Sequence, residues 1–466
     1  MLSLQGEARF NRRAVKVAEA QRRVLEAVQP LPPETAALWR CGGRYLAQSC
    51  EATVDWPPFA RAGMDGYAVH AADTAQATAE QPAVLRVTGT VAAGQVYAGT
   101  VQPGTAVRIM TGAAVPAGAD AVVMLEQTAE AAEPGAQAVL VKAPAVPGQN
   151  VAPRGEEFRC GAVIARPGTR LGPGHIAHLG TFGYAEVQVH RRPRVAIFAT
   201  GTELLPVGAP LAPGRIRDSN SAMIAALVES CGGEAIPLGH IADDPAAVSL
   251  ALEAALDEAD AVITTGGVSV GDYDVMAVIM RNLRGAAATR AGAEDPEGAA
   301  HDLLGAVVRE GAQLELPGQG AVPRGAGHGL LFDKVAMRPG SPTSAAMVNG
   351  KPLWALSGNP GACHVGFELF VRPALRRMQG SSSPLHRTVN ARLGAAVRKG
   401  SPHDRYVRAV LGERDGLWTA ELLAFNKSSM MASLPEANAL VRIPAGPEGA
   451  EAGAEVTALL LGPLHE

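Results

Sequence analysis

The pattern of apolar and polar residues changes along the chain. Residues 14–29 carry apolar side chains at helical spacing and end before Pro30, which predicts an N-terminal helix. From about residue 53 to 150, short β-branched runs alternate with Gly and Pro, which predicts a small all-β domain. Residues 167–189 predict a helix and a strand that return to the first segment. The β-branched runs are AVLRVT (83–88), AVRIM (106–110), DAVVM (120–124) and AVLVK (138–142).

Residues 193–280 alternate strand and helix patterns, which predicts a parallel sheet covered by helices. Asp218 or Ser219 is expected to cap the first helix, and Asp244 stands before a proline at the favoured first helical position. Residues 284–329, rich in Ala, Gly and Glu, are interpreted as an inserted surface segment. The expected strands are 194–200, 234–241, 260–264, 330–337 and 352–356, and the expected helices are 219–231, one from 245, and 362–378.

These patterns predict an α/β plus all-β multidomain fold. A central parallel, nucleotide-binding-like α/β domain is flanked by β-barrel-type domains and an elongated helix/strand linking domain. The expected domains are a discontinuous linking domain (1–52 and 153–190), a small β domain (53–152), the α/β domain with its insertion (191–380) and a C-terminal β domain (381–466).

Composition narrows the classes of function. The chain of 466 residues has 41 Lys and Arg against 45 Asp and Glu and only 4% aromatic residues, which argues against nucleic acid as a partner. Its five cysteines are scattered without a CxxC pair, which is typical of a reducing cytoplasm and predicts no zinc or disulfide framework. No signal peptide or membrane span is expected from the apolar pattern, so the predicted location is cytoplasmic.

The segment TGGVSVGDYD (265–274) lies between a predicted strand and a predicted helix. Such a turn presents backbone N–H groups to a phosphate, and glycines allow a ligand to approach the backbone closely. Carboxylates beside a phosphate cradle indicate a hard cation such as Mg²⁺. The residues that suggest this chemistry are Gly266, Gly267, Ser269, Gly271, Asp272 and Asp274.

Three acidic loops follow predicted parallel strands: 201–203, 242–244 and 271–272. Because the carboxyl ends of parallel strands share one edge, we expect these loops to converge on a ligand. Structural interpretations remain open. The glycine segment can be a plain sheet-to-helix turn, Asp65 can shape an Asp-Gly turn, and Glu203 or Asp244 can cap a helix. Asp244 precedes Pro245, so Asp243 is the better ligand candidate of that pair.

Ordered motifs spread along nearly the whole chain, apart from the insertion, resemble the molybdenum insertase (molybdopterin molybdenumtransferase) family, which is related to the E domain of gephyrin. They are PPFARAGMDGYAV (57–69), RIMTGA (108–113) with GADAV (118–122), GQNVAPRGEE (148–157), TGTEL (200–204) with DSN (218–220), TGGVSVGDYD (265–274), MRPG (337–340) and SGNP (357–360).

The resemblance implies that molybdate is inserted into adenylylated molybdopterin with Mg²⁺, releasing AMP, in a homodimer of four-domain subunits. It places the cleft between the α/β domain of one subunit and the C-terminal domain of the other. By motif, the implied catalytic residues are Asp65, Thr111, Glu157, Lys334 and Arg338. The implied substrate-binding residues are Gly266, Gly267, Ser269, Gly271, Asp274, Arg408 and Ser428, and the implied metal ligands are Glu203, Asp243 and Asp272.

Two stretches depart from the family pattern. Ser341 stands where the family usually has Lys, and Gly361-Ala362 stands where it usually has Val-Ser. Losing a cation and a hydroxyl is expected to weaken binding of a dianion such as molybdate. Two alternatives follow: a divergent paralogue that binds the pterin or a protein partner without inserting metal, and an adenylyltransferase, which uses a related α/β domain and would consume ATP.

Overall fold

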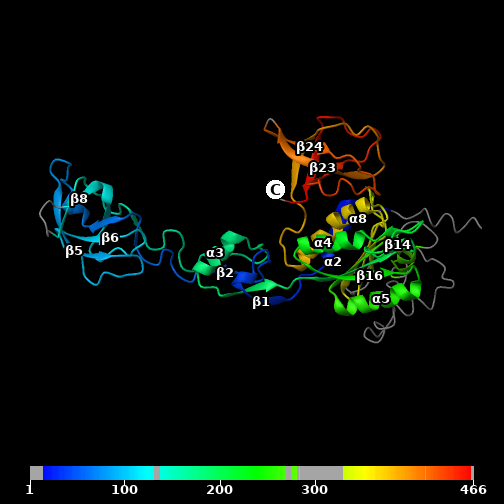
Figure 1. Cartoon of the computed structure of the whole chain (residues 1–466), viewed down its shortest axis with the longest axis horizontal. Coiled ribbons are helices and arrows are strands. Elements are labelled where there is room, and N and C mark those ends of the chain that lie inside the picture. Colours follow the sequence, from blue (N-terminus) through cyan, green and yellow to red (C-terminus); the bar gives the residue numbers. More distant parts are fainter. Residues whose placement is uncertain are drawn as a thin grey trace, which may run out of the picture.

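The computed structural model describes residues 14–130, 137–268, 274–280, 283, 329–414 and 416–462. These residues form an elongated molecule, with a small β domain at one end and the α/β domain and C-terminal β domain at the other (Figure 1). A thinner region with α3 (Pro173–Thr181), β1 (Pro33–Ala37) and β2 (Cys50–Glu51) joins the two ends (Figure 1). The expected fold class, an α/β plus all-β multidomain protein, is confirmed.

The linking region returns on itself, as predicted. Strand β1 pairs antiparallel with β12 (Glu186–His190), β2 pairs with β11 (Val163–Ala165), and β3 (Arg61–Ala62) pairs with β10 (Val151–Ala152). The predicted N-terminal helix is α2 (Val17–Ala27). Its buried face, Val17, Ala20 and Val24, packs into the core of the α/β domain. The N-terminal helix is therefore part of that domain's packing, although the two are far apart in sequence.

The small β domain is one six-stranded sheet with the order β7-β4-β6-β5-β9-β8. All four predicted apolar runs are strands in it, and its two faces carry separate apolar clusters. The strands are β4 (Gly66–Val69), β5 (Ala83–Val91), β6 (Thr105–Ile109), β7 (Ala121–Met124), β8 (Thr128–Glu130) and β9 (Ala138–Val141), with short 3-10 helices at Ala71–Thr74 and Leu125–Gln127. A third 3-10 helix, Leu38–Arg40, follows β1 in the linking region.

The α/β domain is built on a six-stranded sheet with the order β16-β13-β17-β21-β20-β18. The first four strands are parallel, which confirms the prediction made from residues 193–280, whereas β20 pairs antiparallel with both β21 and β18, so the sheet is mixed at this edge. Strand β20 was missed because its sequence, SAAMV, is short and rich in alanine, a weak strand former. The strands are β13 (Arg194–Thr200), β16 (Glu234–Ile241), β17 (Ala261–Thr265), β18 (Gly329–Phe332), β20 (Ser344–Val348) and β21 (Lys351–Leu356).

Helices α4 (Asn220–Ser230) and α5 (Pro245–Glu258) cover this sheet, close to their predicted bounds. Asp218 accepts a hydrogen bond from the Ser221 N–H (3.0 Å), and Asp244 caps α5 by accepting from the Ala247 N–H (2.8 Å). A short parallel pair, β14 (Leu204–Leu205) and β15 (Ile216–Arg217), lies between β13 and α4 in the chain. The predicted insertion lies outside the described residues, except for Gly329.

The helix after β21 changes its winding midway. It runs as α8 (Pro360–Gly366), then a π-helical turn (Phe367–Val371), then α9 (Arg372–Met378). Pro373 has no N–H, so the Leu369 carbonyl lacks its usual donor four residues on. The side chain of Gln21, on α2, donates to that carbonyl instead (3.0 Å). The predicted helix 362–378 is confirmed, and proline explains its irregular middle.

The C-terminal domain is a closed five-stranded barrel, in which β23 pairs with both β24 and β25. The segment 330–337 was predicted as one strand, but it splits: β18 joins the α/β sheet, and β19 (Met337–Arg338) pairs with barrel strand β23. The barrel and the α/β domain of one chain are therefore joined by strand pairing between β19 and β23. The barrel strands are β22 (Thr388–Leu393), β23 (Asp404–Arg414), β24 (Leu417–Leu422), β25 (Ala439–Ile443) and β26 (Glu455–Leu460).

Candidate functional site

The acidic loops after β13 and β16 meet at the carboxyl edge of the sheet, as predicted. The Thr202 N–H donates a hydrogen bond to the Asp243 carboxylate (3.1 Å), and the His240 ring bonds to the Gly201 carbonyl through Nε2 (2.7 Å). Asp244 is engaged as the cap of α5, which leaves Asp243 as the carboxylate that faces the neighbouring loop. Glu203 follows Thr202 directly and is exposed.

The double glycine after β17 is required by the protein's own backbone. Gly266 and Gly267 have φ angles of 90° and 61°. A Cβ at Gly266 would lie 2.1 Å from the Thr200 carbonyl oxygen, and one at Gly267 would lie 2.8 Å from the Thr200 hydroxyl. The sequence interpretation assigned these glycines to close approach of a ligand, whereas the close neighbour in the structure is strand β13. Both roles need the same absence of side chains.

The remaining residues of this edge are described only in part. Ser269, Gly271 and Asp272 lie outside the described residues, and Asp274 stands at the start of the helical residues 275–280. Among the residues that the structure describes, no three His, Cys, Asp or Glu side chains lie close enough together to hold a metal ion. The predicted set Glu203, Asp243 and Asp272 therefore stays a prediction, with two of its three members at one sheet edge.

The segment after β21 connects this edge to the barrel, a relationship that the sequence interpretation missed. The Asn220 side chain donates to the Gly358 carbonyl (2.8 Å), and a Cβ at Gly358 would lie 3.5 Å from the Gly266 Cα. Farther on, the Ala362 N–H donates to the Ser428 carbonyl of the barrel (3.2 Å). Asn220 was part of the DSN motif (218–220) noted in the sequence. Nothing in that motif indicates that its side chain contacts Gly358, which is distant in sequence.

The predicted basic residues lie at the junction of the α/β domain and the barrel. Arg338, on β19, is exposed and pairs in register with Arg405 of β23. Lys334 is partly buried, and its carbonyl accepts from the Val15 N–H (3.0 Å). Ser341, which replaces a usual lysine, donates its hydroxyl to the Val335 carbonyl (2.8 Å) and so serves this loop.

Arg408 is buried, with 2% of its surface exposed. Its Nε donates to the Ser433 hydroxyl (3.0 Å), and its Nη2 donates to the carbonyls of Phe425 (2.8 Å) and Met430 (3.0 Å). These bonds fix the loop that carries Ser428. A direct role in substrate binding stays a prediction, while the observed role is to hold this loop against α8.

Asp65 and Thr111 form a pair in the small β domain. The Thr111 hydroxyl and backbone N–H both donate to Asp65 Oδ1, each at 2.7 Å. These two hydrogen bonds, the hydroxyl first, hold the pKa of Asp65 below its usual value. Glu157 pairs with Arg61 (3.2 Å), and Arg154 makes a surface ion pair with Asp55 (2.9 Å). The small β domain lies at the opposite end of the molecule from the α/β sheet (Figure 1).

Three further titratable side chains, those of His175, His178 and Cys363, have structural positions. His175 Nδ1 accepts from the Gly172 N–H (3.1 Å), and exposed His178 packs edge-on against Phe158. Cys363 is fully buried, and burial raises the pKa of its thiol, which keeps it protonated and inert. No helix among the described residues combines the length and apolar character needed to cross a bilayer.

A largely parallel sheet, whose carboxyl edge carries acidic loops and a double-glycine turn, is joined to a closed barrel. This arrangement defines a multidomain α/β protein. Family models match three consecutive regions: the MoeA N-terminal region (domain I and II; residues 15–183), a probable molybdopterin binding domain (196–377) and the MoeA C-terminal region (domain IV; 390–461). The chain belongs to the MoeA family.

Similar proteins span the whole chain. A molybdopterin molybdenumtransferase of Bacillus subtilis is 39% identical over 450 residues, covering 97% of this chain and 95% of its own. One from Staphylococcus aureus strain COL is 36% identical over 449 residues, covering 96% of each. The crystal structure of a molybdopterin biosynthesis MoeA protein from Pyrococcus horikoshii OT3 is 29% identical, with a TM-score of 0.74, and covers 96% of this chain and 100% of its own.

Proposed function

We propose that this chain is a molybdopterin molybdenumtransferase, which inserts molybdate into adenylylated molybdopterin and releases AMP to give molybdenum cofactor. Relatives with this name match it from end to end. The observation that carries the proposal is the carboxyl edge, where the Thr202–Asp243 hydrogen bond joins two acidic loops beside the Gly266-Gly267 turn. Such an edge suits a diphosphate ligand held with a cation.

The Gly266 N–H donates to the Leu356 carbonyl (3.1 Å), so on the phosphate side the backbone N–H groups of residues 267–271 would hold the diphosphate, with Ser269 and Asp274 as polar neighbours. Glu203, Asp243 and Asp272 would hold Mg²⁺, since hard carboxylate oxygens are the ligands it prefers. When bound, Mg²⁺ would supply positive charge that neutralises the phosphate oxygens. The exposed position of Glu203 and the orientation of Asp243 toward its loop support this assignment.

On the oxyanion side, Lys334 and Arg338 would neutralise molybdate or phosphate oxygens, lowering the cost of bringing two anions together. Arg338 is exposed beside the barrel, which leaves its guanidinium accessible. Ser428, on the loop fixed by Arg408, would contribute from the barrel. No serine or cysteine nucleophile is required, because positioning and charge neutralisation carry this chemistry.

We also propose that the working form is a homodimer. Asp65 and Thr111 occupy the small β domain, far from the carboxyl edge in the same chain (Figure 1). The resemblance implies a cleft between the α/β domain of one subunit and the C-terminal domain of the other, but here the barrel contacts the α/β domain of its own chain through the Ala362–Ser428 hydrogen bond. We therefore propose instead that a second chain brings its small β domain to this edge, where both residues, with Glu157, would position the substrate. The cytoplasm is the proposed location, supported by five cysteines that are all free thiols.

The test is release of AMP by the purified protein given adenylylated molybdopterin, Mg²⁺ and molybdate. Release stimulated by molybdate supports the transferase. Tight pterin binding without turnover would indicate the divergent paralogue, the second candidate, because the Ser341 hydroxyl donates to the Val335 carbonyl and supplies no positive charge. ATP consumption without molybdate dependence would indicate an adenylyltransferase.

A further inference from the structure

The loop between barrel strands β24 and β25 carries an exposed aromatic side chain. Phe425, near the start of this loop, is 60% exposed, and Met431 farther along is 47% exposed. An isolated apolar side chain at a surface is ordinary. The backbone of Phe425 is not ordinary, because its φ angle is 57°. This left-handed region is uncommon for any residue with a side chain, and a bulky residue there is an outlier.

Phe425 stands apart from the other residues with this conformation. Among the described residues that are not glycine, only Asn150 and Asn349 also have positive φ angles. Asparagine adopts the left-handed region more readily, because its short amide can hydrogen-bond locally. Phenylalanine has no such group, and an exposed ring gains little from burial. The conformation of Phe425 therefore costs stability that its own side chain does not offset.

Hydrogen bonds to strand β23 hold Phe425 in this conformation. The Phe425 carbonyl accepts from Arg408 Nη2 (2.8 Å) and from the Ser433 hydroxyl (3.3 Å). The side chain of Asn426 accepts from the Arg408 N–H (2.9 Å) and donates to the Arg408 carbonyl (3.2 Å). Because Arg408 is buried, water does not compete for these bonds. Strained residues that their surroundings fix in this way cluster at ligand sites.

The loop packs against a helix that begins at the carboxyl edge of the α/β sheet. The Ser428 carbonyl, three residues after Phe425, accepts from the Ala362 N–H near the start of α8 (3.2 Å). Helix α8 follows strand β21, whose last residue, Leu356, accepts from the Gly266 N–H (3.1 Å). Phe425 is therefore carried on a loop beside the edge that we propose to bind the diphosphate.

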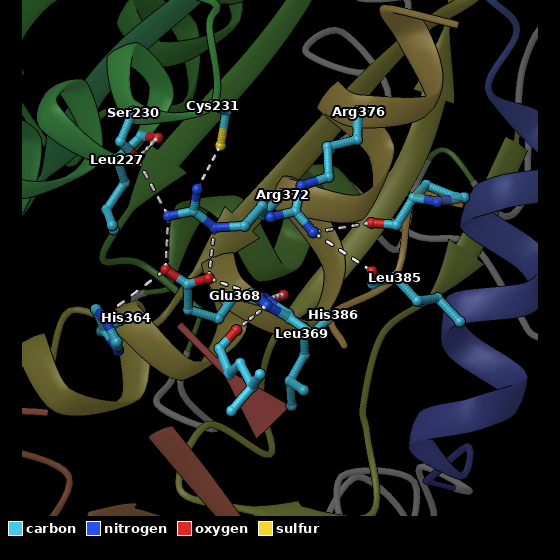
Figure 2. Close-up of polar contacts among 12 residues, drawn as sticks. Leu227, Ser230, Cys231, His364, Glu368, Leu369, Arg372, Arg376, Leu385 and His386 are labelled. Atoms are coloured by element: carbon cyan, nitrogen blue, oxygen red, sulfur yellow. Dashed lines mark hydrogen bonds and ion pairs between the residues drawn. The ribbon is translucent and has the colours of Figure 1, made fainter. Parts of the chain in front are cut away.

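A buried group of side chains keeps the barrel seated on this helix. Glu368, in the π-helical turn after α8, accepts from Arg372 Nε (2.5 Å) and Nη2 (2.9 Å) (Figure 2). His386, two residues before barrel strand β22, lies with Nε2 3.0 Å from Glu368 Oε2 (Figure 2). The position of the Phe425 loop relative to the sheet edge is thus built into the fold. A ring on such a support loses little conformational freedom when a ligand binds.

The charge near Phe425 favours an anionic ligand. Lys427, two residues farther on, is exposed, and residues 423–435 include no Asp or Glu. Proteins that hold nucleic-acid strands without reading their sequence combine aromatic faces for the bases with cations for the phosphates. The same combination suits a small ligand that carries a planar ring and a phosphate.

We propose that Phe425 is a stacking platform for a planar nitrogen heterocycle of a phosphorylated ligand, with Lys427 neutralising a phosphate beside it. For the identity of the ligand this inference rests on the proposed function, because adenylylated molybdopterin carries two such rings, adenine and the pterin. Stacking on a ring that does not react stabilises the ground state and the transition state alike. Phe425 should therefore affect KM for the substrate and not kcat.

The first test measures binding of AMP and of molybdopterin by calorimetry, which requires no turnover. We expect Phe425→Asn to weaken binding of at least one probe by about tenfold or more. Phe425→Tyr keeps the aromatic face and should bind as the unmodified chain does. Lys427→Gln should weaken the same probe, and less so at high salt, since exposed charges are screened.

The pattern of loss identifies the stacked ring. Weaker binding of AMP alone assigns Phe425 to adenine, and weaker binding of molybdopterin alone assigns it to the pterin. Leu417→Asn, which changes an exposed residue on β24 of the same barrel, is the control and should leave both affinities unchanged. Unchanged affinities in Phe425→Asn, or binding of neither probe by the unmodified chain, overturn the proposal.

Urea unfolding of the same variants separates a binding role from a packing role. Phe425→Asn places a residue that tolerates the left-handed region at this position, so it should resist urea better than the unmodified chain. A loss of stability together with a loss of binding would assign the ring to barrel packing and overturn the proposal.

Steady-state AMP release separates this inference from the proposed function. In an active transferase, Phe425→Asn should raise KM for adenylylated molybdopterin with kcat unchanged, and an unchanged KM rejects the platform alone. Weaker probe binding by Phe425→Asn, with no molybdate-stimulated release by the unmodified chain, keeps the platform and rejects the transferase.

Discussion

Arg408 lies against Gly361, and that contact leaves no room for a side chain at position 361. A Cβ at Gly361 would lie 2.6 Å from Arg408 Nη1 and 3.0 Å from the carbonyls of Ser428 and Met430. The space that valine would occupy is filled by the loop that Arg408 holds. The glycine therefore allows the barrel loop to dock on α8, and the neighbouring Ala362 is buried beneath it with 1% exposed.

Gly361→Ala is expected to destabilise this docking. Overpacking typically costs about 1–3 kcal/mol when the neighbours are backbone atoms that cannot rotate away. Urea unfolding should show that loss, and protease cleavage within residues 423–433 should become faster. Gly174→Ala, on α3 with open space at its Cβ position, is the control and should be neutral or stabilising. Equal behaviour of both variants would show that the loop does not depend on Gly361.

Asp243 and Asp244 are adjacent but have different partners, which makes them a matched pair. Asp243→Ala should reduce AMP release by on the order of 100-fold, because a predicted cation ligand is lost. Asp244→Ala should instead lower the free energy of unfolding by about 1 kcal/mol through loss of the α5 cap, with AMP release retained. The assay and urea unfolding should be run on both variants. The assignment fails if Asp244→Ala is the one that loses activity.

The local features of the α/β domain were predictable from the sequence because they depend on neighbouring residues. Strand β13 begins and ends at the predicted residues, and Asp244 caps α5 by accepting from the Ala247 N–H, with Pro245 at the first helical position. The loops at 201–203 and 243 were expected to meet because they follow parallel strands, whose carboxyl ends lie at the same edge of the sheet. The glycines at 266 and 267 were correctly singled out, although their observed neighbour is Thr200 rather than a ligand.

Long-range packing was not predictable in the same way. Arg338 of β19 pairs with Arg405 of β23, which lies in the next domain along the chain. No local sequence pattern indicates which residues pair across such a separation. Burial of Arg408 also had no signal, since arginine is rarely buried and its partners are mostly carbonyls of a distant loop. The departure at Ser341 was interpreted as a lost cation, and its bond to the Val335 carbonyl supplies a structural reason for the hydroxyl.

Glu368 is expected to make the protein sensitive to acid. Burial raises the pKa of Glu368, but hydrogen bonds from His386 and Arg372 outweigh it and lower the pKa from 4.5 to about 2. A lowered pKa contributes stability that is complete above about pH 4.5 and lost as pH falls through about 2. That contribution is on the order of 3 kcal/mol.

Glu368→Gln should therefore flatten the decline of unfolding free energy between about pH 4.5 and pH 2, measured by urea unfolding at each pH. Glu421→Gln serves as the control, because this glutamate pairs with exposed Arg414 and is itself only partly buried. Curves for Glu368→Gln and the unmodified chain that run parallel through this range would exclude Glu368 as the acid-sensitive group.

A mixed dimer tests whether one site draws residues from two chains. Asp65 and Asp243 lie in different end domains, so Asp65→Ala and Asp243→Ala should each inactivate their own homodimer. If the small β domain of one chain completes the edge of the other, a heterodimer of the two variants has one doubly altered site and one intact site. Random exchange makes half of the dimers mixed, so an equal mixture should recover about one quarter of unmodified AMP release.

Light scattering of each variant must show the same dimer as the unmodified chain. If the mixture stays inactive while exchange is demonstrated by differential tagging, each site takes Asp65 and Asp243 from the same chain, and the two-chain assignment is wrong.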